Sequence, residues 1–353
     1  MREKTVGDLI YRRRVERNIT QKQLCDGLCS VQTLSKIESG ERIPDVFLLE
    51  YLLQRLGISA DDFEVVLFDD EFREIELRDT IEEQIVEGNR KEAEMLLERA
   101  YKTAREGIRG QYYYLIKAVL SSALNEHMET VEYIKKALAC THINNIKTIK
   151  EVLLSTKEIE LLCMVAEEYL LLNKDNDARM VLENLLQFID NNDIQEMELV
   201  KTYPKIVYLQ SQFVNNQKER MESIKRCERA FELLARRAST VFLAEIMQLL
   251  IAYYDELKLF NKGLRLKKQL KSMEDLYAEF NRDLYLAQQP MKWFKESKRR
   301  EYLLCEELIR GERIAKRVKR SSFIEGIYED IETLVRIENG SQSPSYKAFQ
   351  MIV

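Results

Sequence analysis

The sequence predicts an all-α protein built from three helical parts, and three observations support this. The 353-residue chain holds only 4 prolines and 11 glycines, which favours helices joined by short connections. A motif close to the N-terminus returns close to the C-terminus. Between the two copies, amphipathic segments follow one another with a period of about 35–45 residues, which is the range of helical-hairpin repeats.

Residues 1–57 predict a compact unit around two short helices. Thr20 precedes the first of them as its N-cap, and Ser30 caps the second. Gly27 permits the sharp turn between them, and Gly40 ends the second helix. The apolar residues at helical spacing are Leu9, Ile10, Leu24, Leu28, Leu34, Ile37 and Leu48. Two helices joined by a short turn with glycine form a helix-turn-helix, and we predict a five-helix domain of that kind.

Residue types at fixed offsets identify this domain more closely. They are Gly7-Asp8-Leu9-Ile10, Arg14, Ile19-Thr20-Gln21, Leu24, Ser30, Thr33-Leu34-Ser35-Lys36-Ile37-Glu38, Gly40, Arg42 and Pro44. The pattern resembles the Xre/Cro-type, or phage-repressor-like, DNA-binding domain. The resemblance implies that Arg14 and Glu38 form a structural ion pair between the first helix and the recognition helix.

The residues expected to contact DNA are those that the core does not need. Leu34 and Ile37 face inward, which leaves the other side of the recognition helix exposed. Gln32 can bond an adenine edge, and Lys36 can bond a guanine edge or a phosphate. Gln21 resembles the family glutamine that grips a phosphate. The predicted DNA-contacting residues are Gln21, Ser30, Val31, Gln32, Thr33, Ser35, Lys36 and Arg42.

The core of the motif recurs at the C-terminus without its contact residues. The segment 333–340 repeats the segment 33–40, and Pro344 repeats Pro44. However, Lys319-Arg320 replaces Thr20-Gln21, and Glu329-Asp330-Ile331-Glu332 places three carboxylates where phosphates would repel them. We predict that residues 291–353 form a degenerate helix-turn-helix-like unit kept for docking or dimerisation. The basic run at 316–320 is the argument for DNA binding instead.

Residues 74–290 predict helical hairpins in series, after an acidic linker at 58–73. The expected helix pairs are 74–87 with 90–106, 109–125 with 129–140, 154–172 with 175–189, 195–214 with 216–236, and 238–257 with 260–279. Small residues such as Ala93 and Ala178 close to the turns permit close packing. The period and these small residues are typical of a tetratricopeptide-like solenoid, with an irregular helical array as the alternative.

The order of these parts resembles that of the peptide-responsive Rgg/PlcR-type quorum-sensing regulators. The resemblance implies a homodimeric transcription regulator, a palindromic double-stranded DNA operator, and a short signalling peptide bound to the first helices of the hairpins. Polar residues of those helices that could bind a peptide are Tyr113, Lys117, Tyr169, Tyr208, Gln212, Gln248 and Tyr253. For each of them, packing or a solvated surface is the alternative role.

Other classes of function have weaker support. A helical scaffold that binds a partner protein, with the DNA-binding domain secondary, is the alternative that we retain. An enzyme is not expected, because the sequence has no Gly-rich phosphate loop or nucleophile motif and its two histidines, His127 and His142, are isolated. The six cysteines lack disulfide or zinc spacing, so no metal or cofactor is expected. The absence of a long apolar stretch and of a signal core predicts a cytoplasmic protein without membrane contact.

Overall fold

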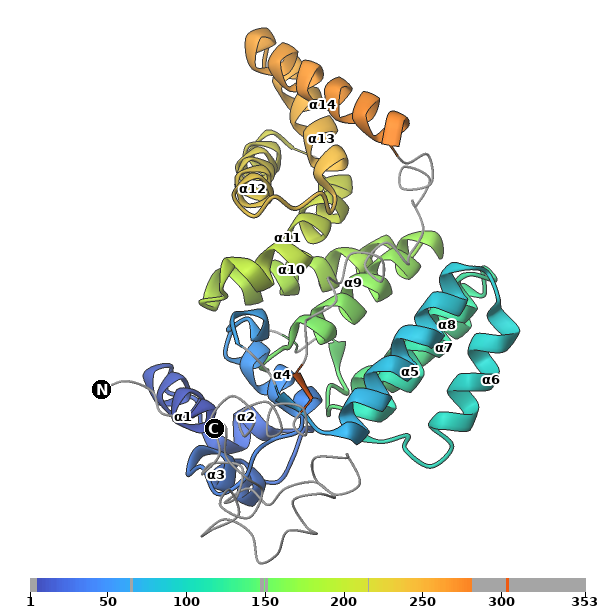
Figure 1. Ribbon diagram of the computed structural model, residues 1–353. Helices are drawn as coiled ribbons and strands as arrows, with labels where there is room; N and C mark the ends of the chain where they lie inside the picture. The colour runs from blue at the N-terminus through green and yellow to red at the C-terminus, as the bar shows by residue number, and fades with distance from the viewer. Residues whose placement is uncertain are drawn as a thin grey trace, which may run out of the picture.

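The computed structural model describes residues 5–63, 66–146, 149, 152–214, 216–280 and a strand at 303–304. α-Helices make up most of this part of the chain and fall into an N-terminal domain and a long array (Figure 1). The degenerate unit predicted at 291–353 lies outside the described residues, apart from that strand. No helix in the described part is long and apolar enough to cross a membrane.

The N-terminal domain packs four short helices around one apolar core. They are α1 (Val6–Glu16), α2 (Gln21–Cys25), α3 (Val31–Glu38) and α4 (Val46–Arg55). Thr20 and Ser30 are the N-caps of α2 and α3, as predicted, because each side chain accepts the backbone N–H three residues on. The fully buried core residues include Ile10, Leu24, Leu34, Leu52, Leu53 and Leu56.

The described residues up to 57 contain four helices instead of the five predicted, and the predicted linker after them begins with a single 3-10 turn, η1 (Ala60–Asp62). Gly57 has a φ of +66°, which ends α4, and its carbonyl accepts the N–H of Gln195 at 2.8 Å. The Ser59 N–H donates to the side chain of Gln195 at 2.7 Å, and its hydroxyl donates to Glu198 at 2.9 Å. The backbone after α4 is therefore bonded to the array instead of continuing as a helix.

The array consists of helical hairpins in series. Its helices are α5 (Asp69–Val86), α6 (Arg90–Ala100), α7 (Gly107–Ser122), α8 (His127–Ala139), α9 (Thr156–Leu171), α10 (Asp175–Asn191), α11 (Glu196–Gln210), α12 (Gln217–Arg236), α13 (Leu243–Glu256) and α14 (Phe260–Phe280). A 3-10 turn, η3 (Ser211–Phe213), follows α11. Ala93 and Ala178 are fully buried where the second helices pack closely on the first. The hairpins predicted from the sequence are confirmed, and a continuous apolar core runs from α5 to α14.

The first helix of the array begins five residues before the predicted start. Asp69, Asp70 and Glu71 lie in its first turn, where the helix dipole favours carboxylates. Glu71 accepts the N–H of Phe68 at 2.8 Å and the N–H of Val46 at 3.0 Å. One carboxylate thus fixes the starts of both α5 and α4. Just before α5, the strand β1 (Val66–Leu67) pairs in parallel with β2 (Leu303–Leu304).

Candidate DNA-binding site

The helix α3 presents a polar face to solvent and an apolar face to the core. Its exposed side chains are Val31, Gln32, Ser35 and Lys36. Thr33 is half-buried, whereas Leu34 and Ile37 are buried in the domain core. These positions agree with the alternation read from the sequence. An exposed amide and an exposed ammonium on successive turns of one helix can reach base edges in a major groove.

Ser30 and Thr33 hold the start of α3. The Ser30 hydroxyl accepts the Thr33 N–H at 3.0 Å, and the two hydroxyl oxygens lie 2.9 Å apart. Both side chains therefore lie at a helix N-terminus, where the unpaired N–H groups and the helix dipole attract phosphate. Ser30 has a capping role in addition to the DNA contact predicted for it.

A buried ion pair fixes α1 against α3. The Arg14 guanidinium bonds both oxygens of Glu38, with Nε–Oε1 at 2.6 Å and Nη2–Oε2 at 3.0 Å. Its third donor reaches the carbonyl of Ile19 at 2.9 Å. The hydrogen bond to Glu38 raises the pKa of Arg14. Gln21 joins this network, because its amide Nε2 donates to Glu38 Oε2 at 2.6 Å. The first residue of α2 is thereby oriented from inside the domain.

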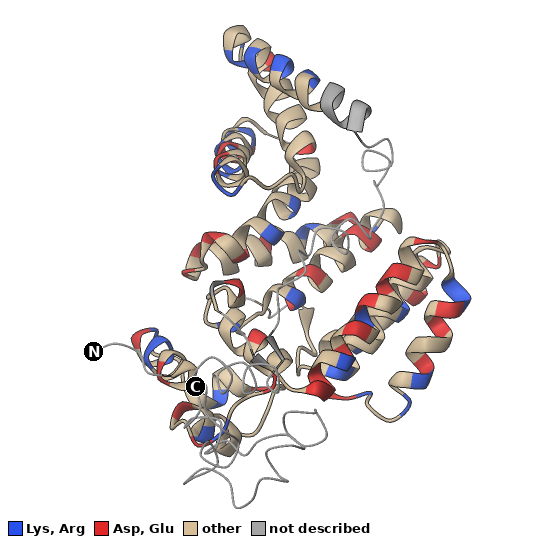
Figure 2. Cartoon of the chain, in the orientation of Figure 1, with Lys and Arg blue, Asp and Glu red and all other residues tan. Residues whose placement is uncertain are grey.

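The loop after α3 folds back on the end of that helix. Gly40 has a φ of +73°, which L side chains rarely adopt. The N–H groups of Glu41 and Arg42 both donate to the carbonyl of Lys36, at 2.8 and 3.1 Å. This places the exposed Arg42 next to the C-terminal turn of α3. By contrast, α5 in the array is predominantly acidic (Figure 2), and its carboxylates repel DNA.

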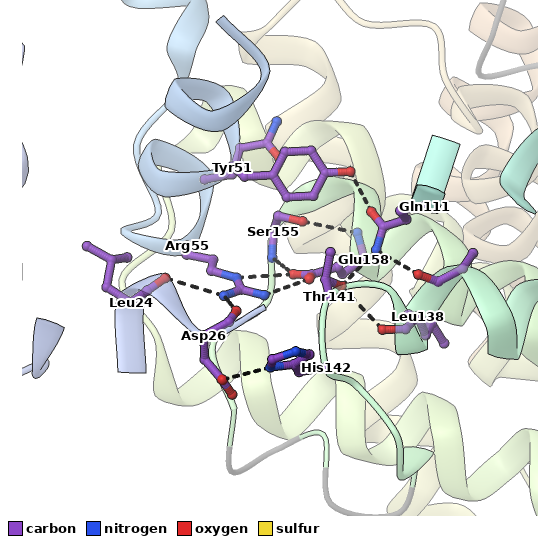
Figure 3. Close-up of polar contacts among 12 residues, drawn as sticks. Leu24, Asp26, Tyr51, Arg55, Gln111, Leu138, Thr141, His142, Ser155 and Glu158 are labelled. Atoms are coloured by element: carbon purple, nitrogen blue, oxygen red, sulfur yellow. Dashed lines mark hydrogen bonds and ion pairs between the residues drawn. The ribbon is translucent and has the colours of Figure 1, made fainter. Parts of the chain in front are cut away.

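The domain is bonded to the array by contacts that the sequence did not reveal. Arg55 pairs with Glu158 at 2.8 Å, and their side chains are 2% and 0% exposed (Figure 3). The Gln54 side chain accepts the N–H of Thr156 at 3.1 Å, and the Tyr51 hydroxyl donates to Gln111. Glu158 closes the capping box of α9, but no sequence motif pairs it or the other residues across the junction. For Tyr51, Gln54 and Arg55 the only sequence signal is polarity at positions of α4 that its apolar pattern would bury.

The turn between α2 and α3 rests directly on the array. A Cβ added at Gly27 would lie 2.4 Å from the backbone of Thr141, so only glycine permits this approach. Asp26 in the same turn bonds His142 at 3.0 Å. Gln111 holds Thr141 from the other side with a bond of 2.8 Å (Figure 3). The glycine predicted for turn geometry thus also serves domain docking.

The residues predicted to bind a ligand lie at separate places in the array. Burial raises the pKa of Tyr113 to about 12, and its hydroxyl donates to Glu98 at 2.6 Å. Lys117 donates to Glu94 at 2.6 Å and lies 3.2 Å from Glu98, so Tyr113 and Lys117 share one carboxylate.

The other five differ in exposure and partners. Tyr253 is buried and its hydroxyl lies 2.9 Å from that of Ser223. Tyr208 packs against Phe242 with ring centroids 5.7 Å apart, and the Lys174 ammonium lies 5.9 Å from the ring centroid of Tyr169. The two exposed glutamines of the predicted set are Gln212, in η3, and Gln248, in α13.

Thiols and histidines in the described residues form no metal site. No group of three His, Cys, Asp or Glu side chains within that part of the chain could hold a metal ion. Cys25, Cys29, Cys140, Cys163 and Cys227 are free thiols. Burial raises the pKa of Cys29 to about 11, so this thiol is protonated at neutral pH.

Comparison with known proteins identifies the N-terminal domain. Residues 10–63 match the family model described as Helix-turn-helix. The domain built from α1 to α4 is therefore a helix-turn-helix domain. The chain is also similar to a solved structure of Bacillus thuringiensis PlcR in complex with the peptide PapR7 and DNA. That similarity has 18% sequence identity and a TM-score of 0.43, over 78% of this chain and 98% of the PlcR chain. No curated protein matches the chain.

Proposed function

We propose that this protein is a sequence-specific DNA-binding transcription regulator that acts as a dimer, with an activity controlled by a ligand of its helical array. The observation that carries the proposal is the exposed face of α3, with Gln32, Ser35 and Lys36, on a helix-turn-helix domain. The Arg14–Glu38 pair holds the recognition helix rigid, which spares the ordering cost of presenting these side chains to DNA. The proposal places the protein in the cytoplasm and includes no catalytic step.

Each part of the site has a distinct role in the proposed complex. The N-terminus of α3 and Arg42 bind phosphates on either side of the groove and set the register of the helix. Gln32 and Lys36 then read base edges, each contributing about 1–3 kcal/mol of discrimination against the wrong base. A dimer places two such helices on half-sites separated by a helical turn or its multiples, so the operator is a palindrome.

The ligand that we propose for the array is a short signalling peptide. Solenoids of helical hairpins offer extended surfaces that suit an extended chain. The order of the domains, with a DNA reader followed by such a solenoid, resembles that of the peptide-responsive regulators. The predicted contacts include the exposed Gln212 and Gln248 and the cluster that joins Tyr113 to Lys117 through Glu98.

Selection of DNA by the intact protein tests this function. Wild-type protein is incubated with a random-sequence duplex library, and bound duplexes are sequenced over several rounds. We expect a palindromic site, with an affinity that falls about a hundredfold in the Gln32→Ala, Lys36→Ala double variant, which loses two base contacts. Lys135→Ala, an exposed lysine of α8, is the matched control and should bind like wild type.

Two results would contradict the proposal. Enrichment of no sequence by the wild-type protein would favour the scaffold that binds a partner protein. Equal loss of affinity in the control would show that binding depends on overall charge. The enriched duplex then serves to ask whether peptides selected from a random library change operator affinity.

A further inference from the structure

Arg55 bonds two parts of the molecule at once. Its Nη2 donates to Glu158 Oε1 at 2.8 Å, at the start of α9. Its Nη1 donates to the carbonyl of Asp26 at 2.5 Å and to that of Leu24 at 3.3 Å (Figure 3). These two carbonyls belong to the end of α2, where backbone oxygens lack helical partners. One buried guanidinium therefore joins the turn of the helix-turn-helix to the array.

The carboxylate on the other side is tied into the array in the same way. Glu158 Oε2 accepts the Ser155 N–H at 2.6 Å, and the Glu158 N–H donates to the Ser155 hydroxyl at 3.2 Å. This reciprocal pair is the capping box that starts α9. α9 in turn packs against α8, α10 and α11. A change in the first turn of α9 therefore moves the Glu158 side chain, which bonds Arg55.

The turn has little freedom to avoid such a change. On one side Arg55 holds the carbonyl of Asp26, and on the other the backbone of Thr141 contacts Gly27. The Gly27 backbone leads through three residues into α3. The direction of the recognition helix is therefore set by the array as well as by the core of its own domain.

A charged pair is not needed to keep the two domains together. Replacing a buried ion pair by apolar residues of similar volume is often neutral or stabilising, whereas guanidinium and carboxylate impose directions on what they bond. The apolar contacts of α4 already supply buried area at this junction. The role that remains for the pair is orientation.

We propose that Arg55 and Glu158 are a positioning pair, through which the first turn of α9 and the DNA-reading helix α3 influence each other. The proposal rests on the function proposed above, because it assigns the route by which the array controls DNA binding. Coupling of this kind is reciprocal, so DNA bound at α3 must also stabilise the start of α9.

Hydrogen exchange measured by mass spectrometry on the full-length protein tests the pair. The probe is the duplex enriched from the random library by wild-type protein. We expect that duplex to slow amide exchange at residues 155–159 in the wild type, although the array does not contact the bases. In Glu158→Gln this protection should be lost, and operator affinity should fall by roughly tenfold, within the usual range of coupling between sites. Glutamine preserves the capping box, so α9 keeps its start.

Glu160→Gln is the matched control, because Glu160 lies on the same helix and its salt bridge, to Lys157 at 3.2 Å, stays within that helix. Unchanged protection and affinity in Glu158→Gln would overturn the proposal. So would an equal loss in Glu160→Gln. If Glu158→Gln fails to fold, Arg55→Lys replaces it, since one ammonium cannot bond the carboxylate and both carbonyls together.

A readout without DNA separates this proposal from the proposed function. In the free protein, Glu158→Gln should speed exchange at residues 26–31 about fivefold relative to Glu160→Gln, since the turn loses its tether. That result would support the pair even if the wild type enriched no DNA sequence. Equal exchange at residues 26–31 in the two variants would refute it even if the wild type bound its operator tightly.

Discussion

Two arginine–glutamate pairs in the described part of the chain, Arg14–Glu38 and Arg55–Glu158, differ in what they connect. Arg14 and Glu38 join two helices of one domain, and their side chains are 12% and 5% exposed. Arg55 and Glu158 join two domains, and their side chains are almost completely buried. The first pair holds α1 against α3 within the helix-turn-helix domain, whereas the second holds the orientation of that domain on the array. The same type of ion pair therefore gives rigidity within the N-terminal domain and, in our proposal, couples that domain to the array.

The largest effect is expected from breaking the pair inside the domain. Glu38→Ala leaves the partly buried Arg14 without its carboxylate and should lower the free energy of unfolding by about 3 kcal/mol, the lower end of the range for a buried pair. Urea unfolding followed by circular dichroism measures the loss. Arg13→Ala is the control: it removes an exposed pair with Glu16 at 3.4 Å and should cost at most about 1 kcal/mol. If Glu38→Ala lowered the free energy of unfolding by less than about 1 kcal/mol, the Arg14–Glu38 pair would not be needed for stability.

A smaller effect is expected where the domain meets the array. Gly27→Ala combines a strained φ of +70° with a Cβ that meets the Thr141 backbone. Gly88→Ala has a comparable φ of +83°, but its added Cβ meets nothing within 4 Å. We expect about 1 kcal/mol of backbone strain in both. Gly27→Ala alone should lose further stability, because its Cβ clashes with the Thr141 backbone, and should also lose operator affinity. Paired unfolding and DNA-binding measurements check this, and equal affinities would show that contact with the array does not orient the reader.

The third prediction concerns the array by itself and is measured as a dependence of stability on pH. Burial raises the pKa of Glu82 from 4.5 to about 7. Since the folded protein holds this proton more tightly than the unfolded chain, Glu82 favours folding most below pH 4.5, and its contribution is lost as the pH rises towards 7. Urea unfolding at several pH values should show this decline in the wild type and a flatter profile in Glu82→Gln. The exposed Glu132→Gln should keep the decline of the wild type.

Residues that act locally could be predicted from the sequence, and residues that act across the junction could not. Thr20, Ser30 and Gly40 have roles set by their immediate neighbours in the chain, so their types and spacing were sufficient. The hairpins followed from spacing for the same reason. Arg55 and Glu158 are 103 positions apart, and neither is unusual at its place in a helix. Their pairing depends on how two separate cores stack together, which no local pattern records.

The 3-10 turn η1 after α4, in the segment predicted as a linker, has a similar cause. Ser59 bonds Gln195 and Glu198, which are 136 and 139 positions further along the chain. These bonds hold the backbone after α4 in a form that helical propensity alone would not select. The contact residues of α3 agree in exposure with their predicted role, and their roles on DNA remain predictions.

The sequence distance between Arg55 and Glu158 also sets an order of events during synthesis. A growing chain releases the helix-turn-helix domain first, because domains fold as units from the N-terminus. At that stage Arg55, which bonds the turn before α3, has no carboxylate partner. Glu158 becomes available to it only when the start of α9 has left the ribosome. A chain truncated before residue 158 therefore has a helix-turn-helix domain whose turn is not connected through Arg55 to Glu158. The orientation of the recognition helix therefore depends on synthesis of the chain past residue 158, about a hundred residues after its own domain.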